Sequence, residues 1–370
     1  MQYRPLGKTG KEISVISFGG MRFRPEDYKK DHQICADILH RAQELGVNYI
    51  DTAPDYCGDH SEDIVGLAMR QIRGKRPYVS TKCGLWMAKT AQKAYEQVQR
   101  SRDRLSVDTI DFYYMWCLMS PKDYQRMVVP GGLYEGLLRA QQDGLIGHIC
   151  SSVHMDSADM KPIIDDGRSE AILLGYNALN FAFRRKGLTD CHRAGLGTVA
   201  MNPLGGGIIP RSGEQFAFLK NSPEESIVHA ALRFLIGHKE ITAALPGPST
   251  IAELEECVAA ADLAHTISEE TFAHLAKHLK SELNTLCTSC AYCDKCPIDL
   301  PIVKFLDMYN QYLLGEDPKN MPGKLEATWG ITPADAAKCT QCGICEPLCT
   351  QKLPIMERLK EIASWSCGVN

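Results

Sequence analysis

Two short runs near the C-terminus hold half of the sixteen cysteines in this chain. The runs CTSCAYCDKCP and CTQCGICEPLC contribute four each, namely Cys287, Cys290, Cys293 and Cys296, then Cys339, Cys342, Cys345 and Cys349. Cysteines separated by two residues bring three thiolates to one centre from a single loop, and a distant cysteine completes the set. This spacing predicts two 4Fe-4S clusters in a helical domain.

The division of these cysteines between two clusters follows a general rule, since in two-cluster ferredoxins the fourth cysteine of each run binds the other cluster. We therefore assign one cluster to Cys287, Cys290, Cys293 and Cys349, and the second to Cys339, Cys342, Cys345 and Cys296. Pro297 fits the usual ending of such a run, whereas Thr350 departs from it. The alternative is a pair of zinc sites, which also use closely spaced cysteines. Eight evenly spaced cysteines without histidine favour the clusters.

A second group of residues could carry out acid–base chemistry. Asp51 and Lys82 follow neighbouring apolar runs, and Tyr56 lies on the segment between them. A lysine ammonium beside a tyrosine lowers the pKa of the phenol, and Asp51 would orient Lys82. Tyr56 would then protonate a carbonyl oxygen as it is reduced. The alternative is a structural ion pair between Asp51 and Lys82 that closes a barrel. Spacing alone does not favour catalysis over this structural role.

Eight apolar runs rich in β-branched residues alternate with segments of helical period before residue 260. The alternation predicts an α/β fold of repeated βα units, and eight units over about 250 residues are typical of a (β/α)8 TIM barrel. Asp51 and Lys82 then fall at the C-terminal ends of strands, where barrels place active sites. The segment MQYRPLGKTGKEIS predicts a hairpin at the opposite end. The runs begin at Ser14, Val47, Arg76, Thr109, Ile146, Ala171, Gly197 and Ile241.

Length and charge limit the domain organisation and the partners. A chain of 370 residues suits one large and one small domain, so we place the barrel at 1–265 and a helical linker with a ferredoxin-like domain at 266–370. Lys and Arg total 41 against 45 for Asp and Glu, in no long block, so we expect neither nucleic acid nor a membrane as partner. A polar N-terminus and the lack of an apolar run of roughly 18 residues predict a cytoplasmic protein with reduced cysteines.

Several stretches together resemble the aldo-keto reductases, and in particular their branch with a C-terminal 4Fe-4S ferredoxin-type domain. They are YIDTAPDYCGDHSEDIVG, VSTK, IDFYYMW, MNPLGGG and LPGPST. The resemblance implies a (β/α)8 barrel that reduces carbonyls with NADPH or NADH through a tetrad of Asp, Tyr, Lys and His. Asp51, Tyr56 and Lys82 match the first three members, and Trp116 stands where the family has His. Trp86 and Trp116 could wall a pocket for an aromatic substrate, although aromatic strand residues are more often core.

The resemblance also implies positions for a nicotinamide cofactor, and several of them depart from the family pattern. Leu173 replaces a glutamine, Met201 replaces an aromatic residue, and the LPGPST loop lacks an Arg or Lys for a 2'-phosphate. These departures argue against NADPH. A nicotinamide would bind through Ser152, Asn177, Asn202, Gly247 and Ser249.

The sequence thus predicts an iron–sulfur oxidoreductase that reduces a carbonyl or related conjugated small molecule in the barrel. Electrons would pass one at a time from a ferredoxin or flavodoxin through the two clusters, and oxygen sensitivity would suit anaerobic conditions. One alternative keeps NADP or NAD as the hydride carrier and treats the clusters as an electron outlet. Another is a non-catalytic electron-transfer subunit whose barrel is a docking scaffold.

Overall fold

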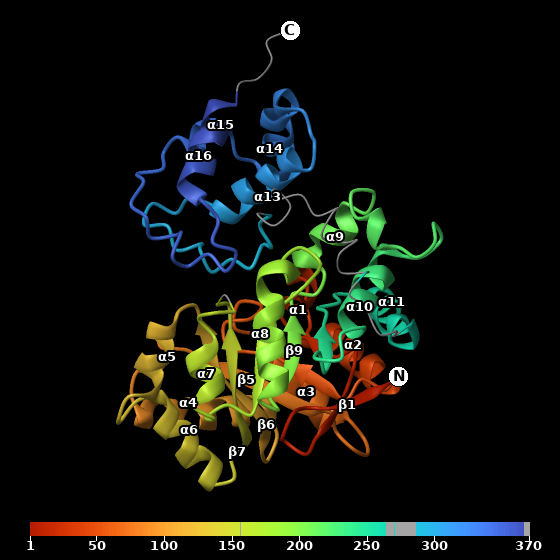
Figure 1. Cartoon of the computed structure of the whole chain (residues 1–370), viewed down its shortest axis with the longest axis vertical. Coiled ribbons are helices and arrows are strands. Elements are labelled where there is room, and N and C mark those ends of the chain that lie inside the picture. Colours follow the sequence, from red (N-terminus) through yellow and green to blue (C-terminus); the bar gives the residue numbers. More distant parts are fainter. Residues whose placement is uncertain (156, 264–269, 271–285, 366–370) are drawn as a thin grey trace. The chain divides into compact units, whose positions relative to one another are not determined.

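The computed structural model describes residues 1–155, 157–263, 270 and 286–365. The chain forms two compact units, one of Met1–Leu204 with Leu219–Ser268 and one of Gly205–Phe218 with Glu269–Asn370. The first unit is an α/β barrel, and the described part of the second is built from helices and connecting segments (Figure 1). Among the described residues, no helix is long and apolar enough to cross a membrane.

Eight strands of the first unit form one sheet in chain order, and every neighbouring pair is parallel. The first and last strands meet through a parallel bridge between Ile16 and Ala244, and the Gly19 N–H donates to the Pro246 carbonyl at 2.8 Å. The sheet is closed, which confirms the predicted (β/α)8 barrel. Each strand overlaps one predicted run: β3 (Phe18–Gly19), β4 (Tyr49–Asp51), β5 (Tyr78–Cys83), β6 (Ile110–Leu118), β7 (Ile146–Val153), β8 (Ala171–Gly175), β9 (Gly197–Met201) and β10 (Ala243–Leu245).

Helices cover the outside of the strands, as Figure 1 shows for α4, α6, α7 and α8. Several begin at a side chain that accepts a hydrogen bond from the first turn, the usual N-cap arrangement: Asp31, Thr90, Ser120, Ser226 and Thr250. The described helices of this unit are α1 (Pro25–Tyr28), α2 (His32–Glu44), α3 (Ser61–Gln71), α4 (Ala91–Leu105), α5 (Pro121–Val128), α6 (Leu133–Gln142), α7 (Lys161–Asp165), α8 (Phe181–Arg193), α10 (Ile227–Ile236), α11 (Ile251–Ala259) and η3 (Ala260–Leu263).

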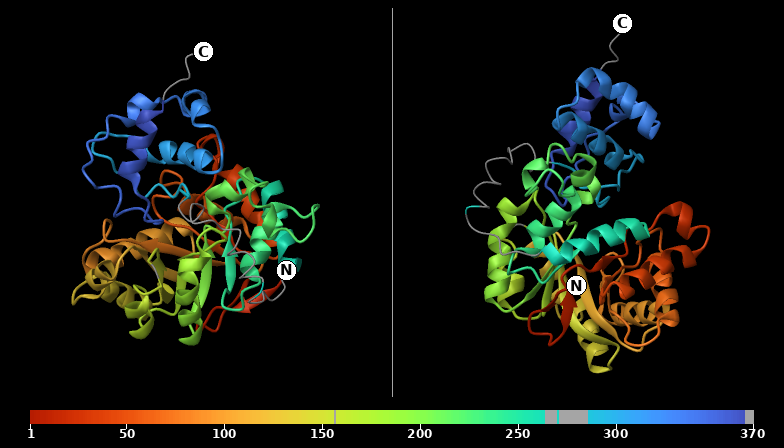
Figure 2. Two further views of the ribbon diagram at one scale, coloured as in Figure 1. Left: turned by 45° about the horizontal axis from the view of Figure 1, so that its top comes forward. Right: turned by 90° about the vertical axis from the view of Figure 1, so that its right-hand side faces the viewer.

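The interior of the barrel is a packed core. Strand residues of alternate position, among them Tyr49, Phe112 and Leu173, form one buried cluster. Leu6 and Ile13 of the N-terminal hairpin, β1 (Tyr3–Pro5) and β2 (Glu12–Ser14), belong to the same cluster. The hairpin, dark red in Figure 2, therefore closes one end of the barrel, as predicted. The polar residues at the C-terminal ends of the strands lie at the other end of the barrel, which is the end available for catalysis.

The second unit has its own apolar core, which its buried cysteines share. Its two longest described helices are α13 (Ile302–Leu313) and α16 (Ile355–Ser364). The predicted boundary between 265 and 266, and the start of the predicted helical linker, lie outside the described residues. The remaining described helices are η1 (Gly205–Gly207), α9 (Ile208–Arg211), η2 (Ala217–Leu219), η5 (Pro318–Asn320), α14 (Met321–Trp329) and α15 (Pro333–Ala336).

The segment Gly205–Phe218 follows β9 yet belongs to the second unit. The Arg211 guanidinium forms an ion pair with Asp307 of α13 at 2.9 Å. Gly206 has φ +69°, and a Cβ there would lie 2.0 Å from the carbonyl oxygen of Thr288, so only glycine permits this approach. The segment is thus fixed against the first cysteine run.

Candidate functional site

A buried ion pair joins β4 and β5 at their C-terminal ends. The Lys82 Nζ donates to Asp51 Oδ2 at 2.6 Å and to the Thr52 carbonyl at 2.7 Å. Ser80, which pairs with Asp51 in the strand register, donates its hydroxyl to Oδ1 at 2.6 Å. Because Ser80 and Lys82 are two residues apart, both side chains lie on the same face of β5 and reach the carboxylate.

Burial governs the electrostatics of this pair. The side chains of Lys82 and Asp51 are 0% and 3% exposed. Burial raises the pKa of Asp51 and lowers the pKa of Lys82, and the charge of each partner opposes both shifts. Each ion thus depends on the other for its charge.

Tyr56 lies beside this pair, but with its ring toward the ammonium. The Lys82 Nζ is 4.8 Å from the centroid of the Tyr56 ring, a cation–π arrangement. Burial, together with the charge of Asp51, raises the pKa of Tyr56 well above its ordinary value. The net shift is opposite to the lowering expected from Lys82, because burial and the charge of Asp51 dominate. Tyr56 is held as a protonated phenol.

Trp116 and Trp86 complete an aromatic group at the same end of the barrel. Trp116 is buried, and its ring contacts two aromatic neighbours. The Tyr56 ring lies edge-on to it with ring centroids 5.6 Å apart, and the Trp86 ring is tilted against it with centroids 4.8 Å apart. Trp86 is 53% exposed and donates its indole N–H to Asp55 at 3.0 Å. A β-bulge between Met115 and Leu118 carries Trp116. Bulges re-aim side chains at barrel rims, and this bulge contains the position that departs from the predicted tetrad.

The predicted nicotinamide contacts divide into two kinds. Ser152 is 1% exposed, and among the described residues its hydroxyl has no hydrogen-bond partner. A buried hydroxyl in that state is suited to a bound ligand. Asn177 differs, because its amide donates to the Asn202 carbonyl at 2.8 Å and accepts from the Leu179 N–H at 2.8 Å. Asn177 therefore orders its own loop, with Asn202 in the left-handed region at φ +59°.

The LPGPST loop has a cation beside it that the sequence analysis missed. The Arg24 Nε donates to the Ser249 hydroxyl at 3.1 Å, and Arg24 lies 3.5 Å from the Glu253 carboxylate. A Cβ at Gly247 would lie 2.9 Å from Cγ of Arg22. Both arginines follow β3, which neighbours β10 in the closed barrel. Strand order was the signal that could have placed them there.

The first predicted cysteine group comes together across the two runs. Burial raises the pKa of Cys287 to about 12, and the nearby Cys290 and Cys349 act in the same direction. Burial also raises the pKa of Cys293, and Cys290, Cys287 and Cys349 add to that rise. Cys287, Cys293 and Cys349 belong to one buried cluster, and each interacts electrostatically with Cys290.

The second predicted group lines a small cavity. Its walls include the four assigned cysteines together with apolar side chains: Cys296, Cys339, Cys342, Cys345, Leu300, Ile302, Met356 and Leu359. Among the described residues, no three His, Cys, Asp or Glu side chains gather closely enough to hold a single metal ion.

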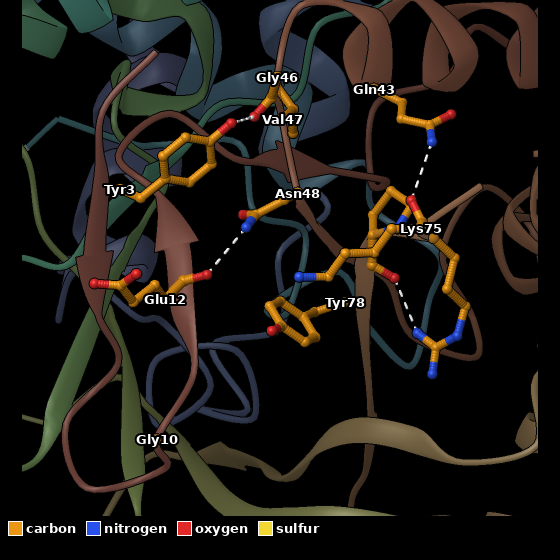
Figure 3. A pocket seen from close by; sticks show the side chains of 11 residues that line it. Tyr3, Gly10, Glu12, Gln43, Gly46, Val47, Asn48, Lys75 and Tyr78 are labelled. Carbon is orange, nitrogen blue, oxygen red and sulfur yellow. Dashed lines mark hydrogen bonds between the residues drawn. The ribbon is translucent and has the colours of Figure 1, made fainter. Parts of the chain in front are cut away.

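A larger cavity of about 550 Å³ lies at the hairpin end of the barrel. Figure 3 shows Lys75 directed toward Tyr78, with its Nζ 5.7 Å from the ring centroid, and Tyr3 donating to the Gly46 carbonyl at 2.9 Å. No predicted site residue lines this cavity. Residues at the N-terminal ends of barrel strands generally serve stability, so the candidate active site is the end with Asp51.

A closed parallel barrel with polar residues at the strand ends defines a (β/α)8 enzyme fold. The sequence profile of the Aldo/keto reductase family matches residues 15–280, and the chain belongs to that family of oxidoreductases. It is 28% identical over 73% of its length to an oxidoreductase of Schizosaccharomyces pombe, covering 88% of that protein. It is 27% identical over 56% of its length to the NADH-specific methylglyoxal reductase of Escherichia coli, covering 69% of that enzyme.

Solved structures agree with the barrel. An aldo-keto reductase from Bacillus halodurans in its holo form superposes with a TM-score of 0.64 at 21% identity, over 76% of this chain and 97% of that one. An aldo-keto reductase from Klebsiella pneumoniae in complex with NADPH gives a TM-score of 0.62 at 21% identity, over 75% and 95%. At these identities the likeness shows the fold alone.

Proposed function

We propose that this oxidoreductase reduces a carbonyl or related conjugated small molecule at the C-terminal end of the barrel, with Tyr56 as proton donor. The observation that carries the proposal is the ring of Tyr56 beside the Lys82 ammonium and the buried Lys82–Asp51 pair. Reduction of a carbonyl to an alcohol adds two electrons and two protons, and Tyr56 supplies the proton that goes to oxygen.

Each neighbour has a separate role in this proposal. The Lys82 ammonium provides positive charge where the carbonyl oxygen becomes negative, and Asp51 fixes its position. Trp116 offers an apolar ring with a single N–H donor where an imidazole would polarise the substrate. A planar, conjugated substrate suits this wall, because aromatic faces favour stacking.

For the second unit we propose two 4Fe-4S clusters, held by the two cysteine groups as assigned. The neighbouring set around Cys287 and the cavity lined by Cys296 and its partners support this assignment. Bound clusters would supply one-electron transfer from a ferredoxin or flavodoxin. The cysteines would hold the iron as thiolates, so loading would release their protons.

A second candidate uses NADPH or NADH as the hydride donor and the clusters as an electron outlet. Two observations favour it, the unpartnered buried hydroxyl of Ser152 and the placement of Arg24 at the LPGPST loop. Relatives named for NADH or solved with NADPH point the same way. The absence of a cation within the loop itself no longer argues against NADPH.

The test begins with purification without oxygen and measurement of iron and acid-labile sulfide. Addition of NADH, NADPH, reduced ferredoxin or dithionite then shows which donor bleaches the cluster absorbance. Bleaching by ferredoxin and dithionite alone supports the one-electron route, bleaching by a nicotinamide supports the second candidate, and zinc without sulfide overturns both cluster assignments.

The role of Tyr56 is tested by Tyr56→Phe in an assay of aldehydes and conjugated ketones. We expect turnover to fall by 10²-fold or more, the usual size of a general-acid contribution, with iron content unchanged. Tyr134→Phe on α6 is the matched control and should retain full turnover. Equal turnover of Tyr56→Phe and the wild type would overturn the role of Tyr56 as proton donor, and no turnover by the wild type on any of these substrates would favour the docking scaffold.

A further inference from the structure

The two cysteine runs differ at the residue after their last cysteine. The first run ends in Cys296–Pro297 and the second in Cys349–Thr350. Thr350 is 2% exposed, and its Oγ1 lies 3.2 Å from Sγ of Cys290 in the other run. The one departure from the pattern thus places a buried hydroxyl on an assigned cluster ligand.

The direction of this hydrogen bond in the loaded protein follows from the chemistry of the cluster ligand. The Thr350 Oγ1 also accepts from the Gln351 Nε2 at 3.3 Å. A thiolate that binds iron has no proton and can only accept. In the loaded protein, the Thr350 hydroxyl therefore donates to the Cys290 sulfur.

Donors to sulfur lie in both cysteine groups. In the group that contains Cys290, the Ser289 N–H donates to Cys287 Sγ and the Leu353 N–H to Cys349 Sγ, each at 3.4 Å. In the other group, the backbone N–H of Cys345 donates to its own sulfur. Thr350 places a side-chain hydroxyl beside an assigned cluster sulfur of the first group.

Burial and hydrogen bonding have opposite effects on a cluster's reduction potential. Reduction adds one electron and makes the cluster more negative, so a dry site disfavours it and donors to sulfur favour it. In the group with Cys290, three of the four cysteines are buried, whereas in the other group Cys342 is exposed. The more buried group is the one that contains the Thr350 contact.

We propose that Thr350 is a positioning residue that raises the reduction potential of the cluster held by Cys287, Cys290, Cys293 and Cys349. The inference rests on the proposed function, since it requires that these cysteines hold a cluster. The cluster gains one electron as the donor ferredoxin or flavodoxin loses one, and no covalent bond forms or breaks. The hydroxyl offsets the effect of burial, so that the same donor can reduce both groups.

The experiment is an anaerobic redox titration followed by electron paramagnetic resonance. The variants are Thr350→Val, which removes the donor at nearly equal volume, and Thr350→Ser, which restores a hydroxyl. Thr340→Val is the matched control, because Thr340 follows a cysteine of the other group and is exposed. Iron and sulfide are measured on every sample.

We expect Thr350→Val to lower the midpoint potential of one of two titrating signals and leave the other unchanged. Thr350→Ser should bring it back toward the wild-type value, and Thr340→Val should shift neither. Full iron and sulfide with unshifted potentials in Thr350→Val would overturn this inference and leave the proposed function intact. Wild-type protein without iron and sulfide would overturn both.

Discussion

At the scale of single residues, the proton on Tyr56 is kept by burial, and Lys82 serves a different purpose from the one its proximity suggested. The Lys82 ammonium donates to Asp51 and to the Thr52 carbonyl, and it faces the ring of Tyr56. It can still stabilise a negative oxygen on a substrate. Because the pKa of Tyr56 is raised, loss of its proton should not limit the rate near pH 10, where an ordinary tyrosine ionises.

The ion pair itself leads to a prediction about stability. Lys82→Met leaves Asp51 buried without its cation, and we expect the free energy of unfolding to fall by about 3–5 kcal/mol, the usual effect of breaking a buried pair. The double variant Asp51→Leu with Lys82→Met removes both charges and should be more stable than Lys82→Met alone. Urea denaturation of the wild type, both single variants and the double variant measures the coupling. Additive losses would show that the two residues are independent.

At the scale of elements, the strands were predictable and their irregularities were not. Parallel strands buried on both faces form continuous apolar runs, so all eight could be located from the sequence. The bulge that carries Trp116 has no such pattern, because an extra residue changes direction without changing composition. The roles of Asp51 and Lys82 at strand ends followed from strand order. The same strand order places Arg24 at the LPGPST loop, because it follows β3, the neighbour of β10, although the residues of the loop itself give no sign of a cation.

The neighbouring positions of β3 and β10 therefore carry a prediction for cofactor preference. If NADPH binds, Arg24→Ala should weaken its binding by about tenfold, the effect of one charge-assisted hydrogen bond, and leave NADH binding unchanged. Fluorescence titration with both nucleotides measures this. Arg102→Ala, on the remote α4, is the control. An equal loss for both nucleotides would place the effect outside the 2'-phosphate.

At the scale of the whole molecule, the chain passes between its two units after Leu204, after Phe218 and after Ser268. The segment Gly205–Phe218 reads as part of the βα alternation, so composition gave no sign that it belongs with the cysteine runs. Tertiary contacts decide this, notably the ion pair between Arg211 and Asp307 and the close approach of Gly206 to Thr288. The spacing of its cysteines made the first run recognisable in the sequence, whereas nothing in the sequence indicated that Gly205–Phe218 packs against it.

The second unit should depend on iron for its fold, while the barrel should not. Cys287, Cys293, Cys345 and Cys349 are buried in its apolar core. Where ligands converge only in the folded state, binding energy becomes folding energy, so removal of the clusters should lower the melting temperature of this unit. The barrel has a separate core, and its transition should stay in place. Calorimetry before and after anaerobic chelation resolves the two transitions.

Cysteine variants test the same dependence of the second unit on iron without a chelator. Cys349→Ser should lose about half of the iron, because it removes one ligand of one proposed cluster, and should lower only the transition of the second unit. Cys257→Ser, a buried thiol on α11 of the barrel, is the control and should keep all of the iron. If chelated protein melts as the loaded protein does in both transitions, the cysteine core is stable without metal and iron has no structural role. A shift in both transitions would show that the two units unfold as one.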